Sequence, residues 1–399
     1  MLIAAVAPAR LTLAQRAIVR ADLDLSALIV GPAGSGKTQV LIHRVCHAIK
    51  SGIPAERIAI FSHGRLHAQN LVDAGTTVGA PVTAQTFDSW CSQYRAAIIK
   101  VPMPKAKGVP DFAAQQQMVL EHVSRNEPRP FDIVFVDEGQ DLSITAYKIL
   151  EKIGTSVTVF ADDMQAIYAG GASLAEIAQC LGLNGPTHQL DDAYRCSRTI
   201  IAMAASFLPD HTRQKQLVHQ AKTEDGETPS LVLCSDNAGE LSAVATAVRI
   251  RCDLRESVAV LLPTKAAVER WNEWLTADGV PVAKKSPDGT SVSGIQILTY
   301  QSCKGLTFDA VFLPELTSQA FSTLPRDVIK RRLFVAVTRA RTWLHLSAVD
   351  SALVEPVSQW PWNPPSFVKV RRPSPSMGRL EARTNAVIPE DDDPFAGLA

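Results

Sequence analysis

The sequence has no excess of charge of either sign, since 40 lysines and arginines balance 40 aspartates and glutamates. A strongly basic chain would by itself indicate nucleic acid as a partner, and this composition does not. Any surface that binds nucleic acid must therefore be a local basic stripe, and the function has to be inferred from sequence motifs.

The sequence also lacks paired cysteines and long apolar runs. Its seven cysteines include no C-x-x-C pair, which argues against a zinc site of the usual spacing and against a disulfide framework. No apolar run is long enough to cross a membrane. The apolar segment 1–9 has no basic region before it and is interrupted by Pro8, unlike a secretory signal. We expect a soluble, cytoplasmic protein with no membrane partner.

Short apolar runs rich in β-branched residues alternate with helical segments along the chain. This alternation predicts an α/β fold in which mainly parallel sheets are covered by helices on both faces. The rhythm restarts near residue 190, so we expect two lobes, 1–188 and 189–350. The predicted strands are Ala27–Val30, Ile58–Ser62, Ile133–Val136, Val157–Phe160, Ser230–Cys234, Val258–Leu262, Ile295–Thr299, Ala310–Leu313 and Trp343–Leu346.

The last segment, 351–399, differs from the rest in composition. Prolines cluster in it, and it ends in the acidic run Glu390–Asp393 followed by Pro394 and Phe395. Such a composition predicts a largely disordered tail. The acidic-aromatic tip resembles the tip with which single-strand-binding proteins recruit partners, and a plain solvated tail is the alternative.

A glycine-rich loop follows the first predicted strand and opens a predicted helix. It reads Gly31-Pro32-Ala33-Gly34-Ser35-Gly36-Lys37-Thr38 and matches G-x-x-x-x-G-K-[ST]. In such a loop the backbone N–H groups and the helix N-terminus cradle phosphates. The lysine is expected to reach the β- and γ-phosphates of ATP, and the threonine hydroxyl to bind Mg²⁺.

An acidic cluster at the end of a later predicted strand completes the nucleotide site. Asp137 stands where a carboxylate can hold Mg²⁺, and the adjacent Glu138 can orient or deprotonate the attacking water. A solvated acidic loop is the alternative when such a cluster stands alone. The glycine-rich loop upstream favours the functional interpretation, although kinases, transporters and GTPases share that loop.

Six blocks, the acidic cluster among them, stand in the order typical of the UvrD/Rep/PcrA family of superfamily 1 helicases, which the chain resembles from Leu11 to Ser347. They are L-T-L-A-Q-R at Leu11–Arg16, V-D-E-G-Q-D at Val136–Asp141, A-D-D-M-Q-A-I-Y at Ala161–Tyr168, A-Y-R-C-S at Ala193–Ser197, L-T-Y-Q-S-C-K-G-L-T-F-D at Leu298–Asp309 and F-V-A-V-T-R-A-R at Phe334–Arg341. The resemblance implies two RecA-like lobes and ATP hydrolysis with Mg²⁺.

The resemblance also implies roles for single residues. Gln15 would read adenine, Tyr194 would stack on it, and Gln165 would sense the γ-phosphate. Arg195 and Arg339 look like the two arginines that the second lobe contributes to the γ-phosphate. For Arg339 the alternative is a surface arginine in a basic helix.

Residues after the second and third strands contact single-stranded DNA in the family, and aromatic faces and hydroxyls suit such contacts. Core packing is the alternative for Phe87 and Trp90. The corresponding candidates here are Phe61, Ser62, His63, Thr86, Phe87, Trp90 and Tyr168, with Thr299, Gln301 and Ser302 from the second lobe.

Several positions depart from the family pattern. The aromatic and arginine that usually follow the I-Y pair are replaced by a short A-G-G-A stretch, 169–172. Gln301 and Thr307 replace the usual histidine and glutamate, and Gln39 stands near the base where the family often has arginine. There is also little room for the family's large accessory insertions, which help to separate strands.

Two functions remain open from the sequence. The first is an ATP-driven translocase or helicase on single-stranded DNA, moving 3′ to 5′ as the resemblance implies. The second is a regulatory ATPase that gates a protein partner, such as a nuclease in DNA repair or genome defence. RNA in place of DNA stays open as the substrate.

Overall fold

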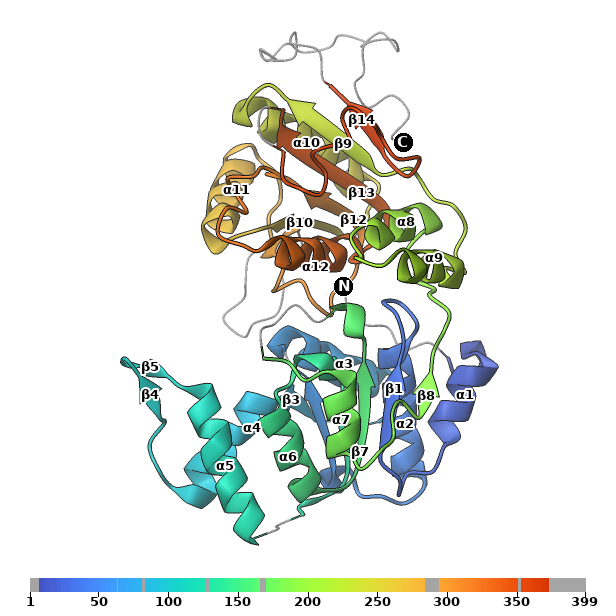
Figure 1. Ribbon diagram of the computed structural model, residues 1–399, viewed down its shortest axis with the longest axis vertical. Coiled ribbons are helices and arrows are strands. Elements are labelled where there is room, and N and C mark those ends of the chain that lie inside the picture. Colours follow the sequence, from blue (N-terminus) through green and yellow to red (C-terminus); the bar gives the residue numbers. More distant parts are fainter. Residues whose placement is uncertain are drawn as a thin grey trace. The chain divides into compact units, whose positions relative to one another are not determined.

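The computed structural model describes residues 7–62, 64–80, 83–126, 129–165, 170–283, 294–350 and 353–372. The chain divides between Tyr194 and Arg195 into two compact units, called here the first and the second unit (Figure 1). The boundary predicted after residue 188 is wrong, because His188–Gln189 forms strand β8 beside β1. The backbone beyond it stays with the first unit, since Leu190 N donates to Val30 O.

The first unit contains a six-stranded, wholly parallel sheet in the order β3-β2-β6-β7-β1-β8. Its four central strands, β2, β6, β7 and β1, are largely buried on both faces, which explains their near-continuous apolar sequences. The bounds are β1 Ala27–Val30, β2 Ile58–Ser62, β3 Ala84–Thr86, β6 Phe131–Val136, β7 Gly154–Ala161 and β8 His188–Gln189, with a separate antiparallel pair β4 Lys105–Ala106 and β5 Val109–Pro110.

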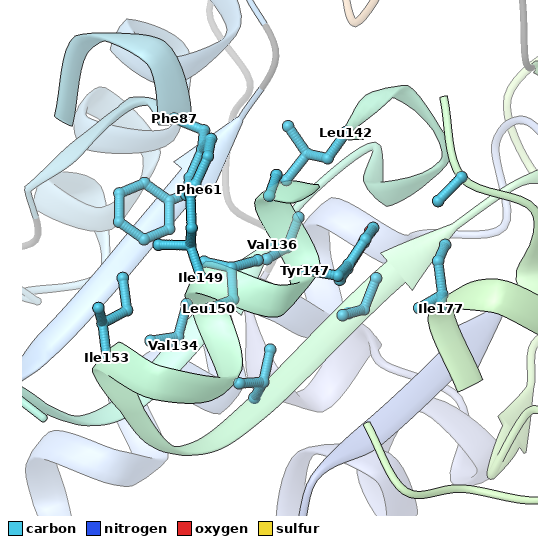
Figure 2. Close-up of a cluster of buried hydrophobic side chains, with 14 of the residues drawn as sticks. Phe61, Phe87, Val134, Val136, Leu142, Tyr147, Ile149, Leu150, Ile153 and Ile177 are labelled. Carbon is cyan, nitrogen blue, oxygen red and sulfur yellow. The ribbon is translucent and has the colours of Figure 1, made fainter. Parts of the chain in front are cut away.

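Helices cover both faces of this sheet, and alternate strand residues point to opposite sides. Phe61 packs with α4 to α7, whereas its neighbour Ile60 packs with α1 to α3. Figure 2 shows the first of these clusters, with Phe61, Phe87 and Tyr147 among its side chains. The helices are α1 Leu13–Arg20, α2 Lys37–Lys50, α3 Arg65–Thr77, α4 Phe87–Tyr94, α5 Phe112–Asn126, α6 Ile144–Ile153 and α7 Leu174–Cys180.

The second unit repeats the architecture with a parallel sheet in the order β11-β10-β12-β13-β9-β14. The expectation of two α/β lobes with parallel sheets is thereby confirmed. In the described part of the chain, no helix is both long and apolar enough to cross a membrane. The elements are α8 Arg198–Ser206, α9 His211–Gln220, β9 Ser230–Cys234, α10 Asn237–Asp253, β10 Val258–Leu262, α11 Lys265–Ala277, β11 Gln296–Thr299, β12 Phe308–Leu313, α12 Arg326–Val337, β13 Ala340–Val349 and β14 Lys369–Arg371.

The expectation of a disordered tail from residue 351 is wrong for residues 353–372. Strand β14 pairs in parallel with β9 at the edge of the second sheet. Trp360 is buried, and its ring lies 6.0 Å from Phe207 and 5.7 Å from Phe367. Apolar burial by these aromatic rings anchors a segment whose prolines suggested disorder. The acidic run 390–393 and Phe395 lie outside the described residues.

Candidate functional site

The glycine-rich loop connects β1 to α2 and depends on two glycines. Gly34 and Gly36 have φ values of +82° and +88°, in the left-handed region that side chains disfavour. A Cβ on Gly36 would also lie 2.5 Å from Gln15 Nε2. Since Gly36 is the N-cap of α2, the loop delivers the positive end of a 14-residue helix to whatever binds there.

Lys37 is buried, and its ammonium group stays inside the loop. Nζ donates to Gly31 O at 2.7 Å and to Pro32 O at 3.0 Å, and it lies 3.7 Å from Asp162 Oδ2. An ammonium group held by loop carbonyls can exchange these acceptors for phosphate oxygens. The position supports the expected role of Lys37 as a phosphate clamp.

Asp137 lies directly beside Thr38, although the two are 99 residues apart in the sequence. Thr38 Oγ1 donates to Asp137 Oδ2 at 2.8 Å, and Glu138 N donates to Asp137 Oδ1 at 3.0 Å. A hydroxyl and a carboxylate are the hard oxygen ligands that Mg²⁺ prefers beside substrate phosphates. The described residues contain no cluster of three or more His, Cys, Asp or Glu side chains suited to a metal, and a nucleotide-dependent Mg²⁺ site needs no such cluster.

Glu138 occupies an unusual backbone conformation at the end of β6. Its φ of +54° is left-handed, a conformation that costs energy in a residue with a side chain and is common at functional sites. Gln140 Nε2 donates to Glu138 Oε2 at 2.7 Å, and Gln140 Oε1 accepts from Asp162 N at 2.9 Å. The strained backbone and the Gln140 amide together hold the carboxylate expected to act on the attacking water.

Gln165 is connected to the lysine through Asp162. Gln165 Nε2 donates to Asp162 Oδ2 at 2.6 Å, the oxygen that also lies near Lys37 Nζ. All three side chains are buried. The proximity of Gln165 to the phosphate clamp suits a residue that senses the γ-phosphate.

Gln15 and Tyr194, the expected adenine contacts, both touch the glycine-rich loop. Gln15 donates from Nε2 to Ser35 O at 3.0 Å and accepts from Thr12 N, as part of a capping box at α1. Tyr194 N donates to Gly34 O, and the residue is 43% exposed. Partial burial, together with the hydrogen bond to Asp192, raises the Tyr194 pKa to about 12.

The aromatic residues expected to stack on DNA bases belong instead to the core of the first unit. Phe61 is fully buried, and its ring makes edge contacts with Phe87 at 5.5 Å and Trp90 at 5.9 Å (Figure 2 labels the two phenylalanines). A base cannot reach these faces while the core is packed. For Phe87 and Trp90 the alternative, core packing, is therefore the correct interpretation.

The other predicted strand contacts of the first unit are polar or undescribed. Ser62 is fully buried, and its hydroxyl makes no hydrogen bond with the residues that the structure describes. Thr86 accepts from Ser89 N and so caps α4. His63 and Tyr168 lie outside the described residues.

In the second unit, the predicted strand contacts form a turn after β11. Thr299 N donates to Ser302 Oγ at 2.9 Å, and Ser302 N donates to Thr299 Oγ1 at 3.1 Å. Gln301 lies between them and is partly exposed. The turn presents two hydroxyl groups at the surface, which suits phosphate contacts.

The two expected γ-phosphate arginines of the second unit differ in burial. Arg195 is partly exposed, whereas Arg339 is 1% exposed, so the alternative of a surface arginine is wrong for Arg339. Its guanidinium donates to Val335 O at 3.0 Å, Leu306 O at 3.2 Å and Thr338 Oγ1 at 3.2 Å. These acceptors fix the position of its charge.

Three further residues of the first unit join the site without having been predicted. Gln140 and Asp162 stand inside the motif blocks, and hydrogen bonds between distant strands reveal their contribution. His67, on α3, contacts Asp137 Oδ2 at 2.9 Å and belongs to none of the blocks. No local pattern identifies His67, because its partner is 70 residues away.

Comparisons with known proteins agree with this geometry. A family model described as an AAA domain matches residues 15–171, and one described as a UvrD-like helicase C-terminal domain matches residues 294–347. A protein of Mycoplasma pneumoniae named "Probable DNA helicase" is 24% identical in an alignment 259 residues long, which covers 59% of this chain and 46% of that protein. The chain thus spans less than half the length of that relative.

Among solved structures, the C-terminal domain of a possible DNA helicase from Lactobacillus plantarum matches 44% of this chain and 98% of its own, with 19% identity and a TM-score of 0.36. The two family models fall one in each unit, on a pair of parallel α/β sheets. Together with the ordered motif blocks, these two matches support a UvrD-like helicase.

Proposed function

We propose that the chain is a DNA-stimulated ATPase that moves along single-stranded DNA in the 3′ to 5′ direction. The observation that carries the proposal is one connected network in the first unit. Thr38 contacts Asp137, and Glu138 contacts Gln140. Asp162 donates from its backbone N to Gln140 Oε1 and accepts a hydrogen bond from Gln165. This network joins the expected phosphate clamp, metal carboxylate, base and sensor without a missing member.

The network suits hydrolysis in a defined way. Thr38 and Asp137 would hold Mg²⁺, which in such enzymes neutralises charge on the β- and γ-phosphate oxygens. Lys37 binds the same oxygens, and Glu138 orients the attacking water and accepts its proton. Arg195 and Arg339 would stabilise the charge of the transferring phosphoryl group. Loss of the γ-phosphate then removes the electrostatic attraction between the phosphate and these arginines, and this change can drive a step along the DNA strand.

The test is the steady-state ATPase rate of the full chain alone, with single-stranded DNA, with single-stranded RNA and with duplex DNA. Lys37→Ala serves as the blank, because removal of the clamp abolishes hydrolysis. Strong stimulation by single-stranded DNA in the unmodified chain supports the proposal. An ATPase rate that stays the same with every nucleic acid contradicts the proposal.

Direction needs a separate measurement on strands that carry a fluorophore at either end. Arrival at the 5′ end alone supports 3′ to 5′ movement. Arrival at the 3′ end refutes the polarity, while the ATPase proposal stands.

A regulatory ATPase that gates a partner such as a nuclease is the second candidate function. It is favoured by the burial of Phe61, Phe87 and Trp90, which removes three expected base-stacking faces. The absence of the aromatic-arginine pair after the I-Y block points the same way. DNA-stimulated hydrolysis without any stepping supports this candidate over the first.

A further inference from the structure

His67 is a buried histidine that contacts the carboxylate of Asp137, the proposed metal ligand, which Thr38 and the Glu138 backbone N also contact. It lies in the first turn of α3, is 4% exposed, and places Nε2 at 2.9 Å from Asp137 Oδ2. Asp137 is completely buried. Strands β2 and β6 are parallel neighbours, and α3 begins three residues after β2 ends, so the topology brings its first turn to the end of β6.

We infer that His67 is a positioning residue that fixes the Asp137 carboxylate in the orientation needed to hold Mg²⁺. The inference rests on the proposed function of Thr38 and Asp137 as the metal site. It assigns to this chain a third determinant of metal affinity, contributed from outside the motif blocks.

The hydrogen bonds at Asp137 explain how His67 acts. Oδ1 accepts from Glu138 N, and Oδ2 accepts from Thr38 Oγ1. Thr38 is itself an expected metal ligand, so its hydroxyl cannot alone define the orientation of the carboxylate. An ionised carboxylate only accepts, so the His67 contact requires the hydrogen on Nε2. The His67 donor fixes Oδ2 independently of the ligands, as donors behind metal-binding carboxylates commonly do.

Burial makes this contact difficult to replace. Asp137 and His67 are almost inaccessible to water, so loss of the histidine leaves the carboxylate with one donor fewer and no water in its place. The carboxylate then samples other rotamers, and each encounter with the metal must restore the binding orientation. Metal affinity falls, whereas contacts of the phosphates with the loop and with Lys37 remain.

The test uses three full-length variants and two binding measurements. His67→Leu removes the donor and keeps apolar volume, and His67→Gln restores an amide N–H at a similar reach. Ile153→Ala is the matched control, because it loses core packing in the same unit without touching the site. Mn²⁺ binding in the presence of ADP is followed by electron paramagnetic resonance, and ADP binding is measured separately in EDTA.

We expect His67→Leu to raise the Mn²⁺ concentration for half-saturation by about 10- to 100-fold, the usual effect of losing an outer partner of a metal ligand. His67→Gln should recover most of this loss, and ADP binding in EDTA should stay unchanged. Ile153→Ala should lower the stability of the first unit and leave the Mn²⁺ midpoint in place. If His67→Leu does not fold, His67→Asn takes its place, because its amide is one carbon too short to reach Oδ2.

The result that overturns the inference is a folded His67→Leu or His67→Asn variant with an unchanged Mn²⁺ midpoint. An equal loss in His67→Gln also overturns it, because the donor would then not be the cause. If the unmodified chain shows no ADP-dependent Mn²⁺ binding, the proposed function of Thr38 and Asp137 fails first. The two failures are therefore distinguishable.

Discussion

Gly139→Ala tests whether the base-bearing loop after β6 is as tightly packed as the structure shows. A Cβ at Gly139 would lie 2.4 Å from Val159 Cγ1 and 2.6 Å from Tyr147 Oη, well inside van der Waals contact. Tyr147 Oη donates to Gly139 O at 2.6 Å, and both Tyr147 and Val159 are fully buried. The extra methyl group therefore has no free space.

The expected cost follows from these contacts. Overpacking of a core typically costs about 1–3 kcal/mol. Displacement of the Tyr147 hydroxyl from its acceptor adds about 1 kcal/mol. Replacing glycine restricts the unfolded chain, which offsets about 0.4–1 kcal/mol. We expect the free energy of unfolding of the first unit to fall by about 1–3.5 kcal/mol.

Hydrogen exchange measured by mass spectrometry on peptides from β6 and β7 reports this unit separately from the second one. The expected loss corresponds to exchange that is about 5- to 300-fold faster in the buried strands. Val159→Ala is the partner for a double-mutant cycle, because it removes the atom that the new methyl group meets. Gly139→Ala should cost less in the Val159→Ala background. An equal cost in both backgrounds, or no cost in either, refutes the packing argument.

Three further outcomes are expected. Glu138→Gln should bind ATP and lower turnover by about 100-fold or more, because the amide cannot accept the proton of water; single-turnover hydrolysis measures this, and near-normal turnover contradicts the assignment. Tyr194→Ala should raise KM for ATP by about 2- to 12-fold with kcat little changed, since the exposed ring offers a stacking face; steady-state kinetics beside Tyr194→Phe, which keeps the ring, separates stacking from the hydrogen bond to Asp192. Burial, with Arg371 and Arg251 nearby, lowers the His345 pKa from 6.5 to about 3. Between these pH values the unfolded chain binds a proton at His345 that the folded second unit does not bind, so the free energy of unfolding should fall as pH drops from 6.5 towards 3. Urea titrations across this pH range should find a smaller pH dependence in His345→Gln.

The sequence predicts the central strands but misses three of the four edge strands, β3, β8 and β14. The ranges Ser230–Cys234 and Val258–Leu262 agree with β9 and β10 residue for residue. Central strands of a parallel sheet are apolar on both faces, and that pattern is visible in the sequence. Strands β8 and β14 have mixed, short sequences, and only pairing with a neighbouring strand makes them extended. This tertiary origin also explains the wrong lobe boundary and the ordered segment 353–372.

The site divides in the same way between local and non-local causes. Motif spacing predicts Lys37, Thr38, Asp137 and Glu138, because a phosphate loop and a carboxylate at a strand end require those residue types nearby. The contribution of His67 depends on a helix that follows a different strand, so no sequence pattern indicates it. Phe61 shows the opposite error, since its place at the end of β2 suggests a surface contact. Because neighbouring residues of a strand point to opposite faces of the sheet, Ile60 packs on one face and Phe61 points into the core between β2 and helices α4 to α7 on the other.

The burial of Phe61, Phe87 and Trp90 leads to a prediction about how single-stranded DNA is bound. Trp90 packs against Phe87, with stacked rings 6.1 Å apart, and against Tyr94 at 5.1 Å. Trp90→Leu should therefore lower the stability of the first unit by about 2–4 kcal/mol. Affinity for single-stranded DNA, measured by fluorescence anisotropy at a temperature where the variant is folded, should change less than about twofold. Loss of a true stacking residue costs about 1–3 kcal/mol per base, or about 5- to 150-fold in Kd.

The effects of Trp90→Leu on protein stability and on DNA affinity, compared with each other, distinguish a DNA-binding surface that contacts phosphates from one that stacks on bases. If Trp90→Leu keeps its affinity for DNA, binding depends on phosphate contacts, such as the hydroxyls of the Thr299–Ser302 turn, and should weaken steeply with salt. Thr299→Ala with Ser302→Ala should then raise Kd at every DNA sequence alike, since phosphate contacts carry no base information. A Kd that rises more than about fivefold in folded Trp90→Leu contradicts this reasoning. It would mean that α4 moves when DNA binds and exposes a ring that the free protein keeps in its core.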